Sequence, residues 1–330
     1  MTHHGTVPHE RKETAMGKPK GKVLARAASS AALGAALAAS IAGTAAAEEG
    51  TLAKIKSSGA ITIGHRDASI PFSYYDDRQQ PVGYAIDLCL GIVDAIRSQL
   101  NLSKVEVKYQ PVTSADRIPL MANGTIDLEC GSTTNTLERQ KQVSFTITHF
   151  VTASRWIAKK ATNASTLNDL RGKTVVSTAG TTNLQRITEL NAQRSLGMSI
   201  VSVNGLPEGF QMVESDRAAA FVMDDILLYS LAAQSRSPGD YAISTQALSV
   251  EPYGIMMRKD DKAFKSVVDA AMVEIYKSGR INAIYSKWFL QPIPPKGINL
   301  NVPLSDQLRR VIANPTDSGD PSVYVVGSLQ

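Results

Sequence analysis

A polar segment at residues 129–140, ECGSTTNTLERQ, holds the side chains with the clearest chemical potential. An acidic strand end and a cysteine lead into a loop of Gly, Ser, Thr and Asn, and Arg139 follows. Hydroxyl and backbone N–H groups bind anions, and a planar guanidinium holds both oxygens of one carboxylate. The segment therefore predicts either an anion-binding cradle or, more simply, a strand, a polar turn and the start of a helix.

Arg66 is a second candidate for anion binding, because it follows directly on the apolar strand ITIGH. In α/β proteins, ligands bind where the carboxyl ends of the strands open into a crevice. A surface ion pair is the alternative interpretation of this arginine.

Sequence motifs of catalysis, metal binding and phosphate binding are absent. The chain has no HExxH, CxxC or GxSxG, and after residue 47 its only histidines are His65 and His149. The segment LRGKT at residues 170–174 lacks the glycine that a phosphate loop needs five residues before Gly172. We therefore expect no catalytic residue, no metal and no cofactor.

Strands and helices alternate along the chain in two sets. The first set has strands at 61–66, 104–112 and 125–130, and helices at 84–100, 117–122 and from 137. The second set has strands within 173–178, 198–203 and 218–224, and helices at 183–194, 208–216 and 225–235. This alternation predicts mostly parallel sheets.

Two long extended runs, at residues 148–160 and 249–261, separate the two sets. We expect two crossovers between two lobes, with residues 48–152 and 252–330 in lobe 1 and residues 153–251 in lobe 2. A cleft between lobes is a common site for a small ligand. Residues 262–289 should be helical, and the tail should wrap lobe 1 and fray after about Pro315.

Residues 1–47 have the pattern of a secretory signal peptide with an upstream extension. A basic stretch, GKPKGKVLAR, precedes a small apolar run that ends in Ala45-Ala46-Ala47. A transmembrane helix is the alternative, but the run is rich in Ala and poor in larger apolar residues. We expect cleavage after Ala47 and export, with Met1 or Met16 as the initiator.

Most of the net positive charge of the chain lies in this leader. Of the 35 Lys and Arg and the 30 Asp and Glu, residues 1–47 hold six and two, which leaves 29 and 28 from Glu48 onward. The aromatic residues are few and are not interleaved with basic ones. A nucleic-acid partner is therefore not expected.

The two cysteines, Cys89 and Cys130, both follow the leader. An even number of cysteines in an exported chain favours a disulfide, and two buried thiols are the alternative. Cys89 lies on an apolar helical stripe, and Cys130 ends an apolar strand. A helix packed on its sheet would bring the two together.

Beyond these patterns, the chain resembles the glutamate/aspartate-binding proteins of amino-acid ABC importers, in solute-binding protein family 3. The segments that carry the resemblance are GHRDASIPFSYYDD, VTSADRIPL, NGTIDLECGSTTNTLERQKQ, AGTTN, AFVMDDILL, YGIMMRKDD and QPIPPK. They run in order from about Leu52 to about Pro315. The resemblance implies an α/β, two-lobed periplasmic-binding-protein fold with two crossover strands and a central ligand cleft.

By the same resemblance, a ligand's α-carboxylate is gripped by Arg139 and by donors of the CGSTT loop, Ser132 and Thr134. The GTT turn of lobe 2 closes on this carboxylate through Thr182. Such a turn opens a helix, where free N–H groups favour an anion. Ser132 and Thr134 are otherwise interpreted as turn formers.

The remaining groups of an acidic amino acid have counterparts as well. The resemblance places the ammonium on Asp224 and the distal carboxylate on Arg66, Ser114 and Arg117. From the sequence alone, Arg117 could equally pair locally with the preceding aspartate. The next residue, Asp225, is interpreted as a helix N-cap rather than as a ligand contact, and Asp224 is an alternative for that capping role.

Three arginines and one aspartate give the predicted site a charge of about +2, which favours L-glutamate or L-aspartate over neutral amino acids. Leu206 stands where the family has a ligand-contacting histidine, which leaves the preference between glutamate and aspartate open. The expected partner is an ABC permease, and the expected state is a periplasmic monomer.

Three other functions remain compatible with this pattern. One is an enzyme on the same fold, of the arogenate or prephenate dehydratase kind, in which Asp67 or Glu129 would supply the acid. The second is a binding protein for another polar amino acid, and the third is a related sensor domain.

Overall fold

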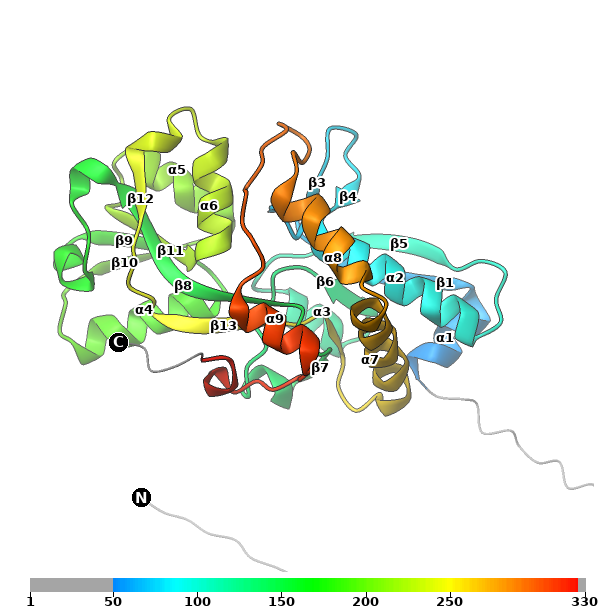
Figure 1. The fold of residues 1–330 in the computed structure, drawn as a ribbon. Helices are drawn as coiled ribbons and strands as arrows, with labels where there is room; N and C mark the ends of the chain where they lie inside the picture. Colours follow the sequence, from blue (N-terminus) through cyan, green and yellow to red (C-terminus); the bar gives the residue numbers. More distant parts are fainter. Residues whose placement is uncertain (1–49, 326–330) are drawn as a thin grey trace, which may run out of the picture. The chain divides into compact units, whose positions relative to one another are not determined.

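The described part of the chain is residues 50–325 of a computed structural model, which belong to one compact unit (Figure 1). Residues 1–47, interpreted above as a leader, lie outside the described residues. The described elements form two main sheets and one small sheet, with helices packed on them.

The first sheet has the strand order β5-β1-β6-β14-β7. Its strands are β1 (Ala60–His65), β5 (Glu106–Pro111), β6 (Leu128–Cys130), β7 (Val143–Phe145) and β14 (Met256–Arg258). Strand β1 pairs in parallel with β5 and β6, whereas β14 is antiparallel to both β6 and β7.

The helices beside the first sheet are α1 (Thr51–Ser58), α2 (Tyr84–Gln99), α3 (Arg117–Ala122), α7 (Lys262–Lys277), α8 (Arg280–Tyr285) and the π-helical η5 (Ser286–Leu290). The apolar stripe predicted for α2 is buried against the core. The helical stretch expected at 262–289 is interrupted at Gly279, whose φ of 76° is left-handed.

The second sheet has the order β10-β9-β11-β8-β12, and β13 also pairs with β8. Its strands are β8 (Phe150–Lys159), β9 (Thr174–Thr178), β10 (Ser199–Val203), β11 (Ala220–Asp224), β12 (Tyr241–Ile243) and β13 (Ser249–Tyr253). Its helices are α4 (Thr182–Gln193), α5 (Leu206–Glu214) and α6 (Asp225–Gln234). Short 3-10 turns are η1 (Arg139–Lys141), η2 (Lys160–Thr162), η3 (Leu167–Leu170) and η4 (Pro238–Asp240).

The prediction of mostly parallel sheets is wrong, because both sheets are mixed. Strands β9, β10 and β11 are parallel, but β8 is antiparallel to each of β11, β12 and β13. Strands β8 and β13 are the two extended runs between the element sets, and Figure 1 shows them running side by side across the unit. A chain that leaves and returns along adjacent strands must place them antiparallel.

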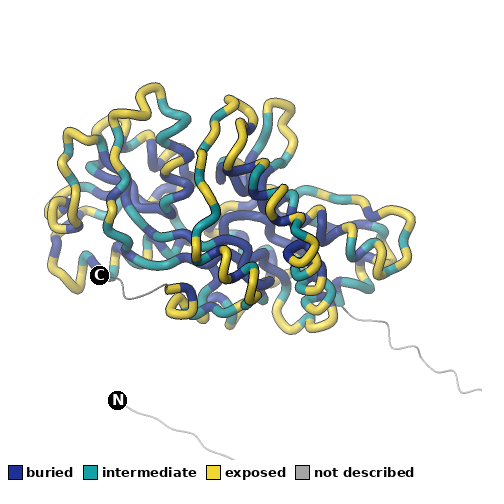
Figure 2. Tube along the Cα trace, in the orientation of Figure 1, coloured by how far each residue is buried: buried dark blue, intermediate teal, exposed yellow. Residues whose placement is uncertain are grey.

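An aromatic cluster holds the ends of these two crossover strands. The ring of Phe72 lies 4.9 Å from that of Phe150, at the start of β8, and 5.2 Å from that of Tyr253, at the end of β13. Tyr84 and Phe289 contact the same ring from α2 and η5. Figure 2 shows that buried residues lie mainly in the middle of the unit while the outer loops are exposed. The crossovers are therefore fixed at the first sheet by packing.

A disulfide joins Cys89 of α2 to Cys130 at the end of β6, with the Cα atoms 6.3 Å apart. Both residues are fully buried. Of the two interpretations of the cysteines, the structure contains the bonded pair. The bond ties the helix to the strand that leads into the 131–138 loop.

The C-terminal tail corrects a second expectation. It forms α9 (Asp306–Ala313) and η6 (Pro321–Tyr324). The small third sheet, by contrast, comes from the first part of the described chain and consists of β2 (Ala68–Ser69), β3 (Ser73–Tyr75) and β4 (Pro81–Val82). Within residues 316–325, the Thr316 carbonyl accepts from the Thr148 N–H at 2.8 Å, and the buried Tyr324 hydroxyl bonds the Thr148 side chain. For residues 316–325, the expected fraying after about Pro315 is thus wrong, because a buried aromatic side chain anchors this part of the tail.

Candidate functional site

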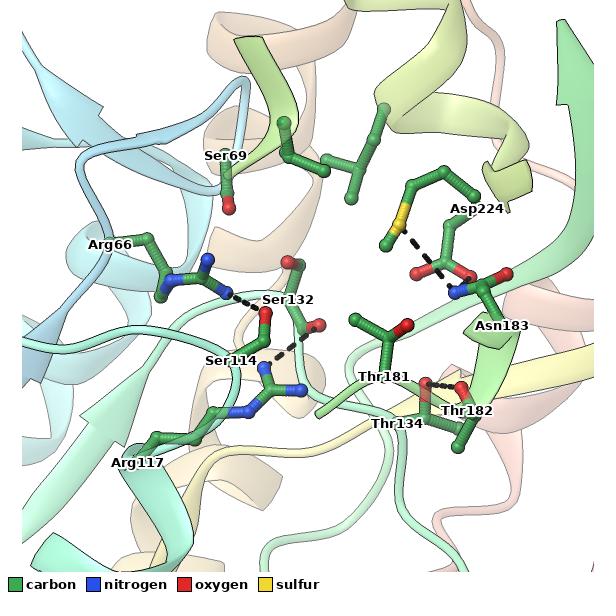
Figure 3. Close-up of a pocket in the computed structure, with 13 residues that line it drawn as sticks. Arg66, Ser69, Ser114, Arg117, Ser132, Thr134, Thr181, Thr182, Asn183 and Asp224 are labelled. Carbon is green, nitrogen blue, oxygen red and sulfur yellow. Dashed lines mark hydrogen bonds between the residues drawn. The ribbon is translucent and has the colours of Figure 1, made fainter. Parts of the chain in front are cut away.

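A pocket lies where the strand ends and helix starts of the two sheets meet (Figure 3). Thirteen residues line it: Arg66, Ser69, Ser114, Arg117, Ser132, Thr134, Thr181, Thr182, Asn183, Leu206, Met223, Asp224 and Leu227. Most of them carry hydroxyl, amide or charged groups. The pocket is therefore suited to a small polar ligand.

One end of the pocket is cationic. Arg66 follows β1, and Arg117 begins α3, so neighbouring elements of the first sheet bring them together. Both are nearly completely buried, at 4% and 2% exposure. The Arg66 Nη1 donates to the Ser114 Oγ at 2.9 Å, and Figure 3 shows this hydroxyl between the two guanidinium groups.

The charge of Arg117 acts on the nearby Arg66. Burial and the nearby Arg117 lower the pKa of Arg66 to about 10, so its guanidinium stays protonated at neutral pH. Two buried guanidinium groups in one pocket repel each other. A carboxylate placed between them would relieve that repulsion and accept from both.

The opposite end of the pocket is anionic. Asp224 ends β11, and Figure 3 shows it across the pocket from Arg66 and Arg117. Its Oδ1 accepts from the Asn183 Nδ2 at 3.0 Å, and its Oδ2 accepts from the Tyr253 hydroxyl. Burial, followed by the charge of Glu251, raises the pKa of Asp224 to about 7. A ligand ammonium would stabilise its ionised form.

The adjacent Asp225 is not the helix N-cap that the sequence suggested. Asp224 takes the N-cap position of α6 without a side-chain capping bond, which leaves its carboxylate directed to Asn183 and Tyr253. Asp225 instead accepts from the Thr152 hydroxyl at 2.5 Å and pairs with Arg155 at 3.0 Å. It therefore fastens α6 to β8.

Two threonines close the pocket beside the crossover strands. The hydroxyl oxygens of Thr134 and Thr182 lie 3.5 Å apart, and the Thr182 hydroxyl also donates to Glu251 at 2.7 Å. Thr181 caps α4 by accepting from the Leu184 N–H at 3.1 Å. The first turn of α4 thus presents hydroxyl groups and a helix N-terminus to the pocket.

Arg139 lies beside the pocket rather than in its lining. Its Nη1 donates to the Thr134 carbonyl at 2.7 Å, and its Nη2 donates to the Gly180 carbonyl at 3.1 Å. Burial and then Arg117 lower its pKa to about 10. The other seven predicted binding residues line the pocket: Arg66, Ser114, Arg117, Ser132, Thr134, Thr182 and Asp224.

Several residues at the site were absent from the predicted set. Ser69 and Asn183 stand inside GHRDASIPFSYYDD and AGTTN, so the resemblance carried a signal for both. Tyr253 and Glu251 come from β13, and their contacts with the site depend on long-range strand placement. Leu206, at the position matched to a family histidine, does line the pocket.

The charge expected for the site needs correction. Beside the three arginines and Asp224, two further buried carboxylates lie in the same network, on Glu129 and Glu251. The formal charge of the constellation is therefore about zero when every group is ionised, not +2. Within the pocket lining, however, Figure 3 shows Arg66 and Arg117 on one side and Asp224 on the other, so the pocket keeps a cationic and an anionic end.

Other kinds of site were searched for within residues 50–325. No group of three or more His, Cys, Asp or Glu side chains there is placed to hold a metal ion. In the same range, no helix has both the length and the apolar character that a membrane span requires.

The fold and this polar pocket define a binding protein for small solutes, and comparison with known proteins gives the family. Residues 61–291 match the family model for bacterial extracellular solute-binding proteins, family 3, so the chain belongs to that family. Its fold is the two-lobed α/β fold of periplasmic amino-acid-binding proteins, with two crossover strands.

Two curated relatives span most of the chain. The L-glutamate/L-aspartate-binding protein of Pseudomonas aeruginosa is 52% identical over 81% of this chain and 89% of its own length. The glutamate/aspartate import solute-binding protein of Escherichia coli is 42% identical over 91% of this chain and 97% of its own length. Both relatives are named as binding proteins rather than as enzymes.

A solved structure gives the same result for the fold. An ancestral arginine-binding protein bound to arginine superposes with a TM-score of 0.63 at 30% identity, covering 70% of this chain and 98% of its own.

Proposed function

We propose that this chain binds one acidic amino acid, L-glutamate or L-aspartate, and delivers it to an ABC permease. The observation that carries the proposal is the separation of charge in the pocket. Arg66 and Arg117 with Ser114 form one end, and Asp224 forms the other. An acidic amino acid has a side-chain carboxylate to match the first end and an ammonium to match the second, and its α-carboxylate is left for Arg139 and the donors near it.

The proposal assigns each ligand group to a set of donors or acceptors. The distal carboxylate lies between Arg66 and Arg117, and the ammonium lies on Asp224. The α-carboxylate is held by Arg139 with the hydroxyl or backbone donors of three further residues, Ser132, Thr134 and Thr182. The contacts of Arg139 support this assignment, because its guanidinium donates to the Thr134 carbonyl and to the Gly180 carbonyl just before α4.

Closure of two lobes around the ligand completes the proposed mechanism. Residues 48–152 with 252–330 would move as lobe 1 and residues 153–251 as lobe 2, joined through β8 and β13. Hinge closure of this type buries a ligand between rigid bodies. The antiparallel pair β8 and β13, fixed by the aromatic cluster at one end, supports a hinge at this place.

The leader and the names of the relatives support a proposal for the setting of the protein. We place the mature chain in the periplasm after cleavage behind Ala47, as a monomer without a nucleic-acid partner. The near balance of charges after residue 47 and the names of the relatives, an import protein among them, support this setting.

A thermal-shift panel tests the proposed ligand class. The panel contains L-glutamate, L-aspartate, L-glutamine, L-asparagine and L-arginine, added to protein refolded from denaturant to remove endogenous ligand. A ligand at 100 times its Kd stabilises the folded state by about 2.7 kcal/mol. We expect shifts with the two acids alone. A shift with glutamine or arginine and none with either acid would refute the proposal.

A further inference from the structure

A buried acid that the binding scheme does not use lies behind the cationic end. Glu129 lies in β6 and is fully buried. Its Oε2 accepts from the Thr133 hydroxyl at 2.6 Å, and that same hydroxyl oxygen accepts from the Arg117 Nη1 at 2.5 Å. Thr133, also fully buried, thus connects a carboxylate to one of the two pocket arginines.

The other oxygen of the carboxylate lies close to the second pocket arginine. Glu129 Oε1 has no hydrogen-bond partner among the described residues. A Cβ atom built on Gly131 would lie 2.3 Å from this oxygen and 3.1 Å from the Arg66 Cγ. The glycine therefore allows the acid and the Arg66 stem to lie against the same short stretch of backbone.

The charge of this acid acts on the arginines. Glu129 favours the protonated form of Arg66, against the effects of burial and of Arg117, which lower its pKa. A buried carboxylate without a compensating cation is strongly destabilising, so the acid and the guanidinium groups depend on each other. With Glu129 ionised, the Arg66–Arg117 end carries a net charge of about +1, the charge that one ligand carboxylate neutralises.

We propose that Glu129 is a positioning and specificity-determining residue, which orients Arg117 through Thr133 and limits the cationic end to a single net positive charge. The inference rests on the proposed function. It predicts two separable effects. Loss of the Thr133 hydroxyl disturbs the orientation of Arg117, and loss of the Glu129 charge changes which anion the site prefers.

The test compares L-glutamate with L-phosphoserine by isothermal titration calorimetry. The two ligands have side chains of similar reach, but a phosphate carries a charge of about −1.5 to −2 at neutral pH. Glu129→Gln keeps an acceptor for Thr133 and removes the charge. We expect its affinity for phosphoserine relative to glutamate to rise about tenfold or more over the wild type.

Variants of Thr133 separate orientation from charge. Thr133→Val should weaken both ligands by about tenfold or more and leave their ratio within about threefold of the wild type. Thr133→Ser keeps the hydroxyl and should restore wild-type binding. These variants also keep the inference testable if Glu129→Gln does not fold, as circular dichroism would show.

The outcomes distinguish the inference from the function on which it rests. A wild-type protein that binds glutamate, together with a Glu129→Gln variant whose ligand ratio stays within twofold, would overturn the role in specificity alone. Weak binding by Thr133→Ser, equal to that of Thr133→Val, would overturn the role in positioning. A wild-type protein that binds no acidic amino acid would overturn both the function and the inference.

Discussion

Gly180 provides a sharp test of lobe closure, because it lies where the second sheet's loops touch the first. It follows β9, has a φ of 72°, and its carbonyl accepts from the Arg139 Nη2 at 3.1 Å. A Cβ atom at this position would lie 2.6 Å from both the Ala115 Cα and the Ser114 O. Gly180→Ala therefore forces the two backbone segments apart.

The size of the effect follows from these distances. Ordinary contact begins at 3.4 Å, so the segments must separate by about 0.8 Å, which stretches the bond to Arg139 to about 3.9 Å. Loss of a hydrogen bond to a charged group costs about 1.5–3 kcal/mol, which corresponds to roughly 10–150-fold in affinity. We expect glutamate to bind Gly180→Ala more weakly by that factor.

Gly172→Ala is the matched control for this experiment. Gly172 has nearly the same φ, 69°, but a Cβ atom there meets nothing within 4 Å. Both variants thus carry the same left-handed strain of about 1–2 kcal/mol, and one alone carries the contact. Calorimetry gives the affinities, and small-angle X-ray scattering shows whether the ligand still compacts the protein. Affinities of the two variants within twofold of each other would refute the reasoning.

Three further predictions follow from the described contacts. Because the pKa of Asp224 is raised to about 7 and a ligand ammonium favours its ionised form, glutamate affinity should fall about tenfold per pH unit below pH 7 and level off above it. Calorimetry at pH 5.5, 6.5 and 8 measures this profile, and an affinity that does not change with pH would contradict the prediction. The double variant Cys89→Ser, Cys130→Ser removes a bond that closes a loop with a sequence separation of 41. It should lower the free energy of unfolding, measured with urea, by about 4 kcal/mol. A urea midpoint of unfolding equal to that of the wild type would argue against the bond. Gly131→Ala should weaken glutamate binding, because the added Cβ displaces the buried Glu129 carboxylate. Gly239→Ala is the control and should bind as the wild type does, because a Cβ atom there meets nothing within 4 Å. Equal binding by the two variants would argue against the close approach of Gly131 to Glu129.

The sequence predicted those features of the fold that depend on local pattern. The helix Tyr84–Gln99 and the strand Ala60–His65 appear close to their expected bounds, because burial of one face imposes its periodicity on the residues. The antiparallel return of β14 beside β6 was not predictable in the same way. It depends on where the chain re-enters the first sheet after about one hundred intervening residues.

The tail and the charge balance of the site show the same limit of prediction from local sequence pattern. Tyr324 holds the tail through a contact with Thr148, which is distant in sequence, so composition alone suggested fraying. Glu251 enters the network only because β13 lies beside the start of α4. Glu129, by contrast, lies inside the segment first singled out. It is connected through Thr133 to Arg117, which comes from another element, so this connection could not be derived from spacing.

A crystal structure of the refolded protein with L-glutamate tests the central claim most directly. We predict the side-chain carboxylate between the guanidinium groups of Arg66 and Arg117, and the ammonium within hydrogen-bond distance of the Asp224 carboxylate. A ligand bound elsewhere, or one whose ammonium lies at the arginine end of the pocket, would contradict the account.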